Sequence, residues 1–136
     1  MMFRLSLALI ASLAAAPALA GDAAKGEKEF NKCRSCHEVV SASGDVIVKG
    51  GKTGPNLWGV AGRTAGSAEG FSYGPHMVAA GEKGLTWDEA SFAAYTADPA
   101  GFLKEYLGDS KAKAKMTFKL KKGAEDIFAY LVSVSQ

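Results

Sequence analysis

A pair of cysteines followed at once by a histidine limits the possible folds of this chain more than any other feature. The segment reads Cys33-Arg34-Ser35-Cys36-His37, and the chain has two cysteines in all. This C-x-x-C-H pattern is the attachment signature of a c-type haem. One helical turn directs both thiols toward the two vinyl groups, where thioethers form, and holds the imidazole under the iron as the proximal ligand. The motif therefore predicts a chain folded around one covalently bound haem c.

Three other roles for Cys33 and Cys36 stay open at this point. A thioredoxin-like redox pair needs a βαβ context, whereas this motif follows a helical pattern with no parallel-sheet pattern nearby. A zinc site needs four ligands, and beyond the motif the chain offers only His76. A structural disulfide suits an oxidising compartment but leaves the histidine of the motif unexplained. Haem attachment is the favoured interpretation because it accounts for all three side chains.

The first twenty residues are typical of a secretory signal peptide that is cleaved. Segment 1–4 carries one positive charge, segment 5–13 is apolar apart from serines, and Ala18-Leu19-Ala20 is a small-x-small cleavage site. The apolar run is too short to cross a bilayer. We therefore expect export, cleavage after Ala20 and a single domain at 21–136. An uncleaved anchor that tethers the protein to the membrane is the alternative.

Charge and composition exclude two broad classes of protein. The formal net charge is +2, and without Arg4 it falls to +1, from 15 basic and 14 acidic side chains. An exported, nearly neutral protein is not expected to bind nucleic acid. With 22% charged residues, 16 glycines and 4 prolines, the chain is globular and rich in turns rather than disordered. We expect no stable membrane insertion, because no stretch after the signal is apolar enough to span a bilayer. We also expect a monomer.

The spacing of apolar residues predicts an all-α fold of a few helices joined by long loops. Each expected helix has an N-terminal cap, a proline start or a one-sided apolar pattern. The expected helices run from Asp22 into the cysteine motif, from Thr86 to about Thr96, from Asp98-Pro99 through Leu107, and over 124–134. Residues 38–66 are dense in turn signals, and we expect loop there. A brief strand or hairpin at Val46-Ile47-Val48 is the alternative, although no sheet pattern accompanies it.

The second axial position on the iron decides what such a protein can do. Methionine or histidine there favours electron transfer, whereas an open position permits gas binding or peroxide chemistry. The candidates are Met116, Met77 and His76. Met116 is favoured because it lies among lysines before the last helix, whereas the other two follow Gly74-Pro75 in an expected turn. A haem enzyme or gas-binding sensor with an exchangeable sixth ligand stays open as the alternative to an electron carrier.

Taken in order, the motifs of the chain resemble those of the class I cytochromes c, and most closely the larger bacterial periplasmic cytochrome c2 type. The resemblance covers residues 21–136 and implies a cytochrome c fold, a periplasmic location and one-electron transfer, with no enzyme activity and no catalytic residues. The matching segments are Gly21–Glu27, Cys33–His37, Lys52–Leu57, Gly62–Thr64, Phe71–Tyr73, Thr86-Trp87, Tyr95, Asp98-Pro99, Lys115–Phe118 and Glu125–Leu131.

The resemblance implies how the iron would be held. His37 and Met116 would be its axial ligands. The carbonyl of Pro55 would accept a hydrogen bond from the His37 Nδ1–H and fix its tautomer, and Tyr95 would hydrogen-bond near the Met116 sulfur. In one place the chain departs from the pattern: many relatives have threonine where this sequence has Ala114. We expect a less tightly held methionine loop and a shifted midpoint potential as a result.

The resemblance also implies partners for the buried haem propionate and a helix crossing. Arg63, Tyr73 and Trp87 would donate hydrogen bonds to the propionate, whose charge needs donors once it leaves water. Gly26 and Phe30 would cross the last helix at Ile127 and Tyr130, because a residue without a side chain allows close approach.

Lysines are concentrated in the segment before the last helix. Between Lys104 and Lys122, seven lysines stand against two acidic residues, a local charge of +5. The resemblance places this segment beside the exposed haem edge. It implies docking to redox proteins with acidic surfaces: a cytochrome bc complex as the donor, and a photosynthetic reaction centre or a terminal oxidase as the acceptor. A solvated face without a partner is the alternative.

Overall fold

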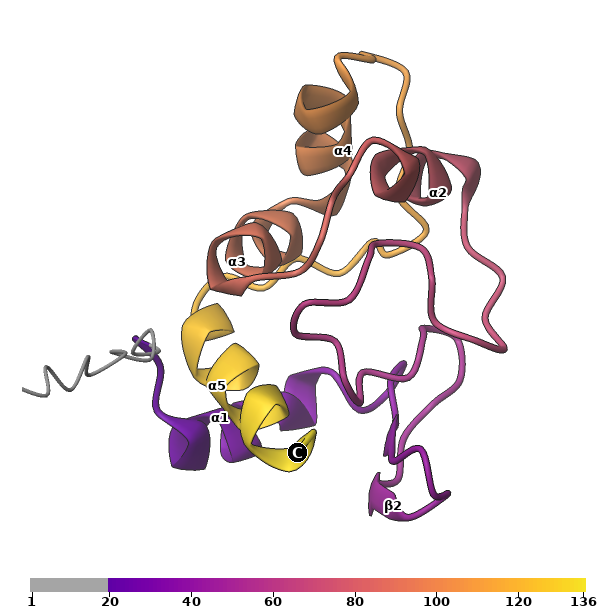
Figure 1. The fold of residues 1–136 in the computed structure, drawn as a ribbon. Coiled ribbons are helices and arrows are strands. Elements are labelled where there is room, and N and C mark those ends of the chain that lie inside the picture. The colour runs from indigo at the N-terminus through magenta and orange to yellow at the C-terminus, as the bar shows by residue number, and fades with distance from the viewer. Residues whose placement is uncertain (1–19) are drawn as a thin grey trace, which may run out of the picture.

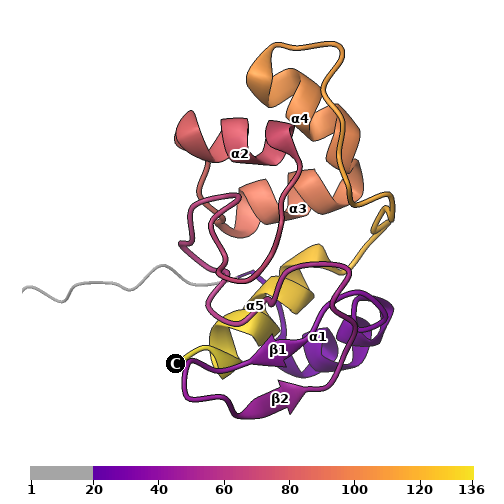
Figure 2. The ribbon, with the colours of Figure 1, turned by 90° about the vertical axis from the view of Figure 1, so that its right-hand side faces the viewer.

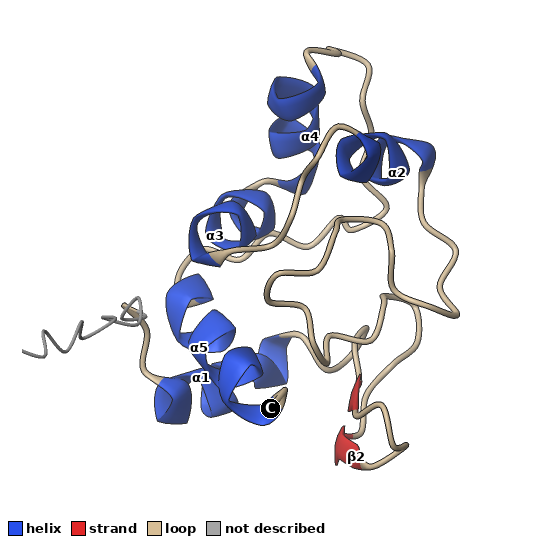
Figure 3. Ribbon diagram, in the orientation of Figure 1, coloured by secondary structure: helices blue, strands red, loops and turns tan. Residues whose placement is uncertain are grey.

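A computed structural model describes residues 20–136, so the expected signal peptide lies outside the described residues except for Ala20. Short helices and a small hairpin are joined by long loops (Figure 1, Figure 3). The elements are α1 (Ala23–Glu29), a 3-10 turn η1 (Phe30–Lys32), β1 (Val39–Val40), β2 (Val46–Val48), α2 (Pro75–Glu82), α3 (Glu89–Ala97), α4 (Pro99–Leu107) and α5 (Ala124–Val134). The expected all-α class is confirmed, with the hairpin as an addition.

The helices form two groups, as Figure 2 shows. One group holds α1 and α5, which pack against each other, together with the hairpin. The other holds α2, α3 and α4, with α4 contacting both of the others, and α3 also reaches α5. The long loop between β2 and α2 passes between the two groups (Figure 1). The cavity described below is lined by the end of η1, by the loops, and by residues of α2, α3 and α4.

The packing of α1 against α5 depends on the absence of a side chain at Gly26. Gly26 is buried, and a Cβ built on it would overlap the carbonyl oxygen of Asp126 and lie 2.8 Å from the Cβ of Tyr130. One turn later the ring of Phe30 packs on that of Tyr130, with centroids 5.9 Å apart. The expected crossing is therefore present, centred on Asp126 and Tyr130, with the neighbouring Ile127 fully buried.

Three of the four expected helices begin or end where the sequence predicts. The Asp22 carboxylate accepts hydrogen bonds from two backbone N–H groups of α1. Asp98 caps α4, which has Pro99 in its first turn and ends at Gly108 in the left-handed conformation, with φ 62°. α5 spans the predicted range. Capping and proline signals act on neighbouring backbone, so they can be recognised without knowing the fold.

The start of α3 was placed two residues too early. Its N-cap is Asp88, whose side chain accepts from the Ser91 N–H while the Ser91 hydroxyl accepts from the Asp88 N–H. Thr86 is not the cap because it pairs with Thr64 in an antiparallel bridge. A tertiary contact thus overrides the local capping pattern.

Two further predictions were wrong. The loop expected across 38–66 contains the antiparallel hairpin of β1 and β2, in which Val39 is fully buried while Val46 is 62% exposed. Residues 75–82, expected as a turn after Gly74-Pro75, form α2, with the proline in its first turn. Proline tolerates that position because the first N–H groups of a helix have no intrahelical partner.

Candidate functional site

A cavity of about 320 Å³ lies between the two groups of helices. Its size falls in the range of roughly 300–1,000 Å³ that is typical of small-molecule and cofactor pockets. The site residues expected from the sequence all line this one cavity: Cys33, Cys36, His37, Pro55, Arg63, Tyr73, Trp87, Tyr95 and Met116. Segments that lie far apart in the sequence are therefore brought to one place.

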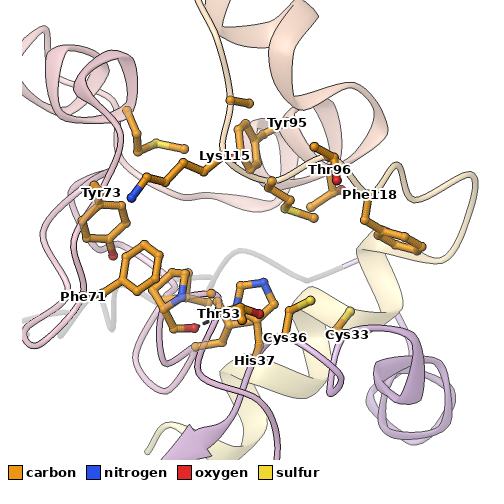
Figure 4. Close-up of a pocket in the computed structure, with 18 of the residues that line it drawn as sticks. Cys33, Cys36, His37, Thr53, Phe71, Tyr73, Tyr95, Thr96, Lys115 and Phe118 are labelled. Atoms are coloured by element: carbon orange, nitrogen blue, oxygen red, sulfur yellow. Dashed lines mark hydrogen bonds between the residues drawn. The ribbon is translucent and has the colours of Figure 1, made fainter.

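The cysteine motif forms one wall of the cavity (Figure 4). It begins at the end of η1 as a single tight turn, in which the N–H groups of Cys36 and His37 both donate to the Cys33 carbonyl. Both cysteines are free thiols. Burial raises the pKa of the Cys33 thiol to about 11. The turn thus presents two thiols and an imidazole to the same cavity.

The imidazole of His37 is held by a main-chain carbonyl in the loop that follows β2. Its Nδ1–H donates to the carbonyl of Pro55 over 2.7 Å, which leaves Nε2 as the nitrogen available to a metal. Burial lowers the pKa of His37, although the bond to Pro55 opposes that shift. A Cβ on Gly54 would overlap the imidazole ring, so only glycine lets this loop pack against it. The result is a neutral, oriented imidazole.

The opposite wall comes from α3 and the loop between α4 and α5. Figure 4 shows Tyr95, Lys115 and Phe118 across the cavity from His37. Of the three candidates for a sixth ligand, Met116 and Met77 line the cavity and His76 does not. Burial raises the pKa of Tyr95 to about 12, so its hydroxyl is a donor at neutral pH.

Arg63 supplies a half-buried positive charge at the edge of the cavity. Its Nη1 donates to the carbonyls of Asn56 and Trp58, at 2.9 and 3.3 Å. Its Nε is buried and has no hydrogen-bond partner among residues 20–136. Burial lowers the pKa of Arg63, while neighbouring Tyr73 raises it. A buried donor with no protein partner is costly, so this corner fits a ligand with an anionic group.

The two other aromatic side chains expected at the site differ in what they contact. The Tyr73 hydroxyl accepts a hydrogen bond from the N–H of Ala68 over 3.1 Å, which leaves its own hydrogen free to donate. Trp87 is 7% exposed and packs against Tyr95, with ring centroids 5.1 Å apart. Core packing and ligand contact are thus compatible for Trp87.

Sequence reasoning missed a contact at the cavity between the loop before α5 and the loop before α2. The Lys115 ammonium donates to the carbonyl of Ser72 over 2.7 Å and lies 5.7 Å from the centre of the Phe71 ring. Lys115 and Phe71 both line the cavity, and Figure 4 shows the lysine reaching toward Tyr73. No local pattern distinguishes this lysine from its neighbours, since its partners come from a distant loop.

The alternatives to haem attachment find no support in this site. Within the described range, no group of three or more His, Cys, Asp or Glu side chains is arranged to hold a metal ion. The sheet has two antiparallel strands, so the parallel βαβ setting of a thioredoxin motif is not formed by residues 20–136. Cys33 and Cys36 are not joined by a disulfide.

Comparison with known proteins agrees with the geometry. The chain is 58% identical to cytochrome c-551 of Roseobacter denitrificans over 132 residues, which cover 96% of this chain and 94% of that protein. It is 57% identical to cytochrome c2 of Rhodobacter capsulatus over 135 residues, 98% of each. The chain belongs to the cytochrome c2 family. None of the known family profiles matches it.

Solved structures of cytochrome c2 have the same fold. That of Rhodobacter capsulatus superposes with a TM-score of 0.83 at 58% identity, over 85% of this chain and all of that one. That of Rhodobacter sphaeroides gives 0.81 at 55% identity, over 85% of this chain and 97% of that one. The expected cytochrome c fold is therefore confirmed.

Membership of the cytochrome c2 family establishes the cofactor and the general activity. The chain carries one covalently attached haem c and is an electron carrier, not an enzyme. The thiols, the oriented imidazole and the unpaired guanidinium nitrogen fit this group: two attachment points, a metal ligand and a donor for an acidic substituent. Among the described residues, no helix has the length and apolar character needed to span a bilayer.

Proposed function

We propose that this protein carries single electrons in the bacterial periplasm, with haem c bound through Cys33 and Cys36 and its iron held between His37 and Met116. The supporting observation is that the two ligand side chains line one cavity from different walls, the imidazole from the cysteine turn and the thioether from the loop before α5. When bound, the haem supplies an iron that changes between the ferric and ferrous states.

Two contacts favour Met116 over the other candidates for the sixth position. Both ring nitrogens of His76 face other protein groups: Nδ1 accepts from the N–H of Lys113, and Nε2 lies 3.6 Å from Asp109. Met77 lines the cavity but belongs to the first turn of α2, where helical geometry limits its reach. Met116 lies in an irregular loop and lines the same cavity as Tyr95, whose hydroxyl would donate to its sulfur.

The optical spectrum of the ferric holoprotein tests this ligand pair. Methionine ligation predicts a weak far-red band from sulfur-to-iron charge transfer and a low-spin spectrum. High-spin features with rapid binding of carbon monoxide would instead indicate an open iron, and would favour a haem enzyme or gas sensor. Intact-mass analysis of the exported protein tests cleavage after Ala20 in the same preparation.

Arg63 is proposed to neutralise a haem propionate, to which Tyr73 and Trp87 would also donate hydrogen bonds. Replacing it with methionine is expected to lower the midpoint potential, because a nearby positive charge destabilises the ferric state. Loss of the bonds to the Asn56 and Trp58 carbonyls should also lower the free energy of unfolding by about 2 kcal/mol. Redox titration and chemical denaturation of the holoprotein measure the two effects.

Arg63→Lys is the matched control for charge. Lysine keeps the positive charge but cannot bond both carbonyls and the ligand at once. The potential should recover more than the stability does. An equal potential in Arg63→Met and the parent protein would contradict the proposed contact.

The docking surface is proposed to be the lysine-rich loop between α4 and α5. Phe118 lines the cavity and is 45% exposed, so the surface has an apolar side chain at its edge. Two lysines near Phe118 already form ion pairs within residues 20–136: Lys32 with Glu29 at 2.6 Å, and Lys119 with Asp98 at 3.5 Å. Exposed lysines without such carboxylate partners in that range, such as Lys121, are better placed to meet an acidic protein.

Electron transfer with a cytochrome bc complex is therefore expected to slow as salt is added. The second-order rate constant should fall by about tenfold or more between roughly 0.01 and 0.3 M ionic strength, because exposed charges are screened beyond the Debye length. Lys121→Gln should slow the reaction at low salt, and Lys119→Gln less so because its charge is partly neutralised by Asp98. A salt-independent rate constant would contradict docking through this loop.

Parallel measurements with a photosynthetic reaction centre and a terminal oxidase identify the acceptor.

A further inference from the structure

His76 joins helix α2 to the loop that carries Met116. It is the second residue of α2, and its side chain is 27% exposed. The Lys113 N–H donates to its Nδ1 over 3.1 Å, and its Nε2 lies 3.6 Å from the Asp109 carboxylate. Asp109 and Lys113 both belong to the loop between α4 and α5, so one imidazole contacts this loop at two points.

A single protonation state of His76 satisfies both contacts. Because the Lys113 N–H is a donor, Nδ1 must act as an acceptor and carry no hydrogen. The hydrogen of the neutral ring is then on Nε2, which faces the Asp109 carboxylate. When a second proton binds at Nδ1, the ring has two donors, and the contact with Lys113 is lost while that with Asp109 is strengthened.

The loop before Lys113 is fixed by its own contacts, so the effect of His76 falls on the segment that follows. Gly108 ends α4 in the left-handed conformation, and the other carboxylate oxygen of Asp109 accepts from the Lys111 N–H over 2.9 Å. Ala112 is 1% exposed. Only Ala114 and Lys115 lie between Lys113 and Met116. Within residues 20–136, the Lys113 N–H makes the last hydrogen bond between α2 and the loop before the methionine, and Lys115 then bonds Ser72 in the loop that precedes α2.

We propose that His76 is a positioning residue that fastens the methionine loop to α2 in its neutral form and loosens it when protonated. This inference rests on the proposed role of Met116 as the iron ligand. A looser loop would give an added ligand easier access to the iron, because Met116 must move aside for it to bind.

The charges around His76 set the limits of this effect. On the loop, the charged side chains nearest to this contact in the sequence are Asp109, which lies 3.6 Å from Nε2, and Lys111 and Lys113. On α2 the charged groups Glu82 and Lys83 lie at the far end of the helix. Lys83 donates to the carbonyl of Tyr106 in α4 over 2.6 Å. That bond does not depend on the state of His76, so α2 stays attached when the imidazole is protonated.

Two substitutions separate the fastening from its dependence on protons. His76→Ala removes both contacts. His76→Asn keeps an oxygen near the position of Nδ1 that can accept from the Lys113 N–H, and it does not titrate. Ser110→Ala, at an exposed residue in the same loop, is the control for a general effect of substitution there.

The test measures amide hydrogen exchange at Lys113 and imidazole binding in the ferric holoprotein. His76→Ala should lower the protection factor of the Lys113 amide and raise the affinity for imidazole, each by about three- to tenfold, and His76→Asn should restore both. In the parent protein, protection should fall as the pH is lowered, and His76→Asn should remove that dependence.

Unchanged Lys113 protection in His76→Ala, or a pH dependence that persists in His76→Asn, would overturn the proposal. A change of the same size in Ser110→Ala would also overturn it. The amide measurement does not depend on the identity of the iron ligand. If the parent protein lacks the far-red band, the ligand assignment fails by itself, whereas a retained band with unchanged imidazole affinity in His76→Ala rejects only the effect on Met116.

Discussion

Replacing Met116 with leucine is expected to abolish the far-red band of the ferric protein and to give an iron that binds carbon monoxide rapidly when reduced. Leucine keeps most of the side-chain volume but has no sulfur to donate. Methionine ligation raises the potential of a c-type haem. The midpoint potential should therefore fall, on the order of 0.1–0.3 V out of the span of about 0.8 V that axial ligands cover.

Met77→Leu is the matched control, because Met77 lines the same cavity and presents the same chemical group. It should keep the far-red band and the potential of the parent protein to within a few hundredths of a volt. The result that would contradict the assignment is the reverse pattern, with the band lost in Met77→Leu and retained in Met116→Leu. Optical spectra and redox titration of the three holoproteins decide between the two methionines.

The site was easier to predict from the sequence than the path of the chain. C-x-x-C-H is a contiguous motif whose spacing reflects the shape of the cofactor, so Cys33, Cys36 and His37 could be proposed as its attachment points and ligand without a structure. Spacing favoured Met116, and family resemblance supplied Pro55 and the propionate partners. Their meeting at one cavity depends on how α1 and α5 pack relative to the other helices.

What the sequence did not predict depends on contacts between distant segments. The α3 start moved because Thr86 pairs with Thr64. The hairpin is the exception, since its strands are close in the sequence and form where turn signals predicted loop. The contacts of Lys115 with Ser72, and of His76 with Lys113, join segments more than thirty residues apart. Side chains of this kind have no local pattern, since their role is set by the partner that folding brings to them.

Gly26→Val is expected to be the most destabilising substitution in the helical framework. A Cβ at this position overlaps the backbone carbonyl of Asp126, and a backbone atom cannot turn aside as a flexible side chain can. Valine adds two further methyl groups at the same point. Either α1 and α5 separate, or the backbone shifts. Overpacking of this kind costs roughly 1–3 kcal/mol and more where main chain is displaced, so we expect a loss of about 3 kcal/mol or more in the free energy of unfolding.

Ala24→Val, at an exposed position of the same helix, separates this clash from helix propensity. Valine is a weaker helix former than alanine, and there it should lower stability by about 0.5 kcal/mol. Chemical denaturation of both holoproteins, followed by far-UV circular dichroism, measures the difference. Equal losses in the two variants would mean that α1 can move away from α5 without penalty.

Because the cysteine turn follows directly from α1 and η1, a displaced α1 should also disturb the ligand field of the iron. The far-red band of Gly26→Val should therefore weaken before the protein unfolds.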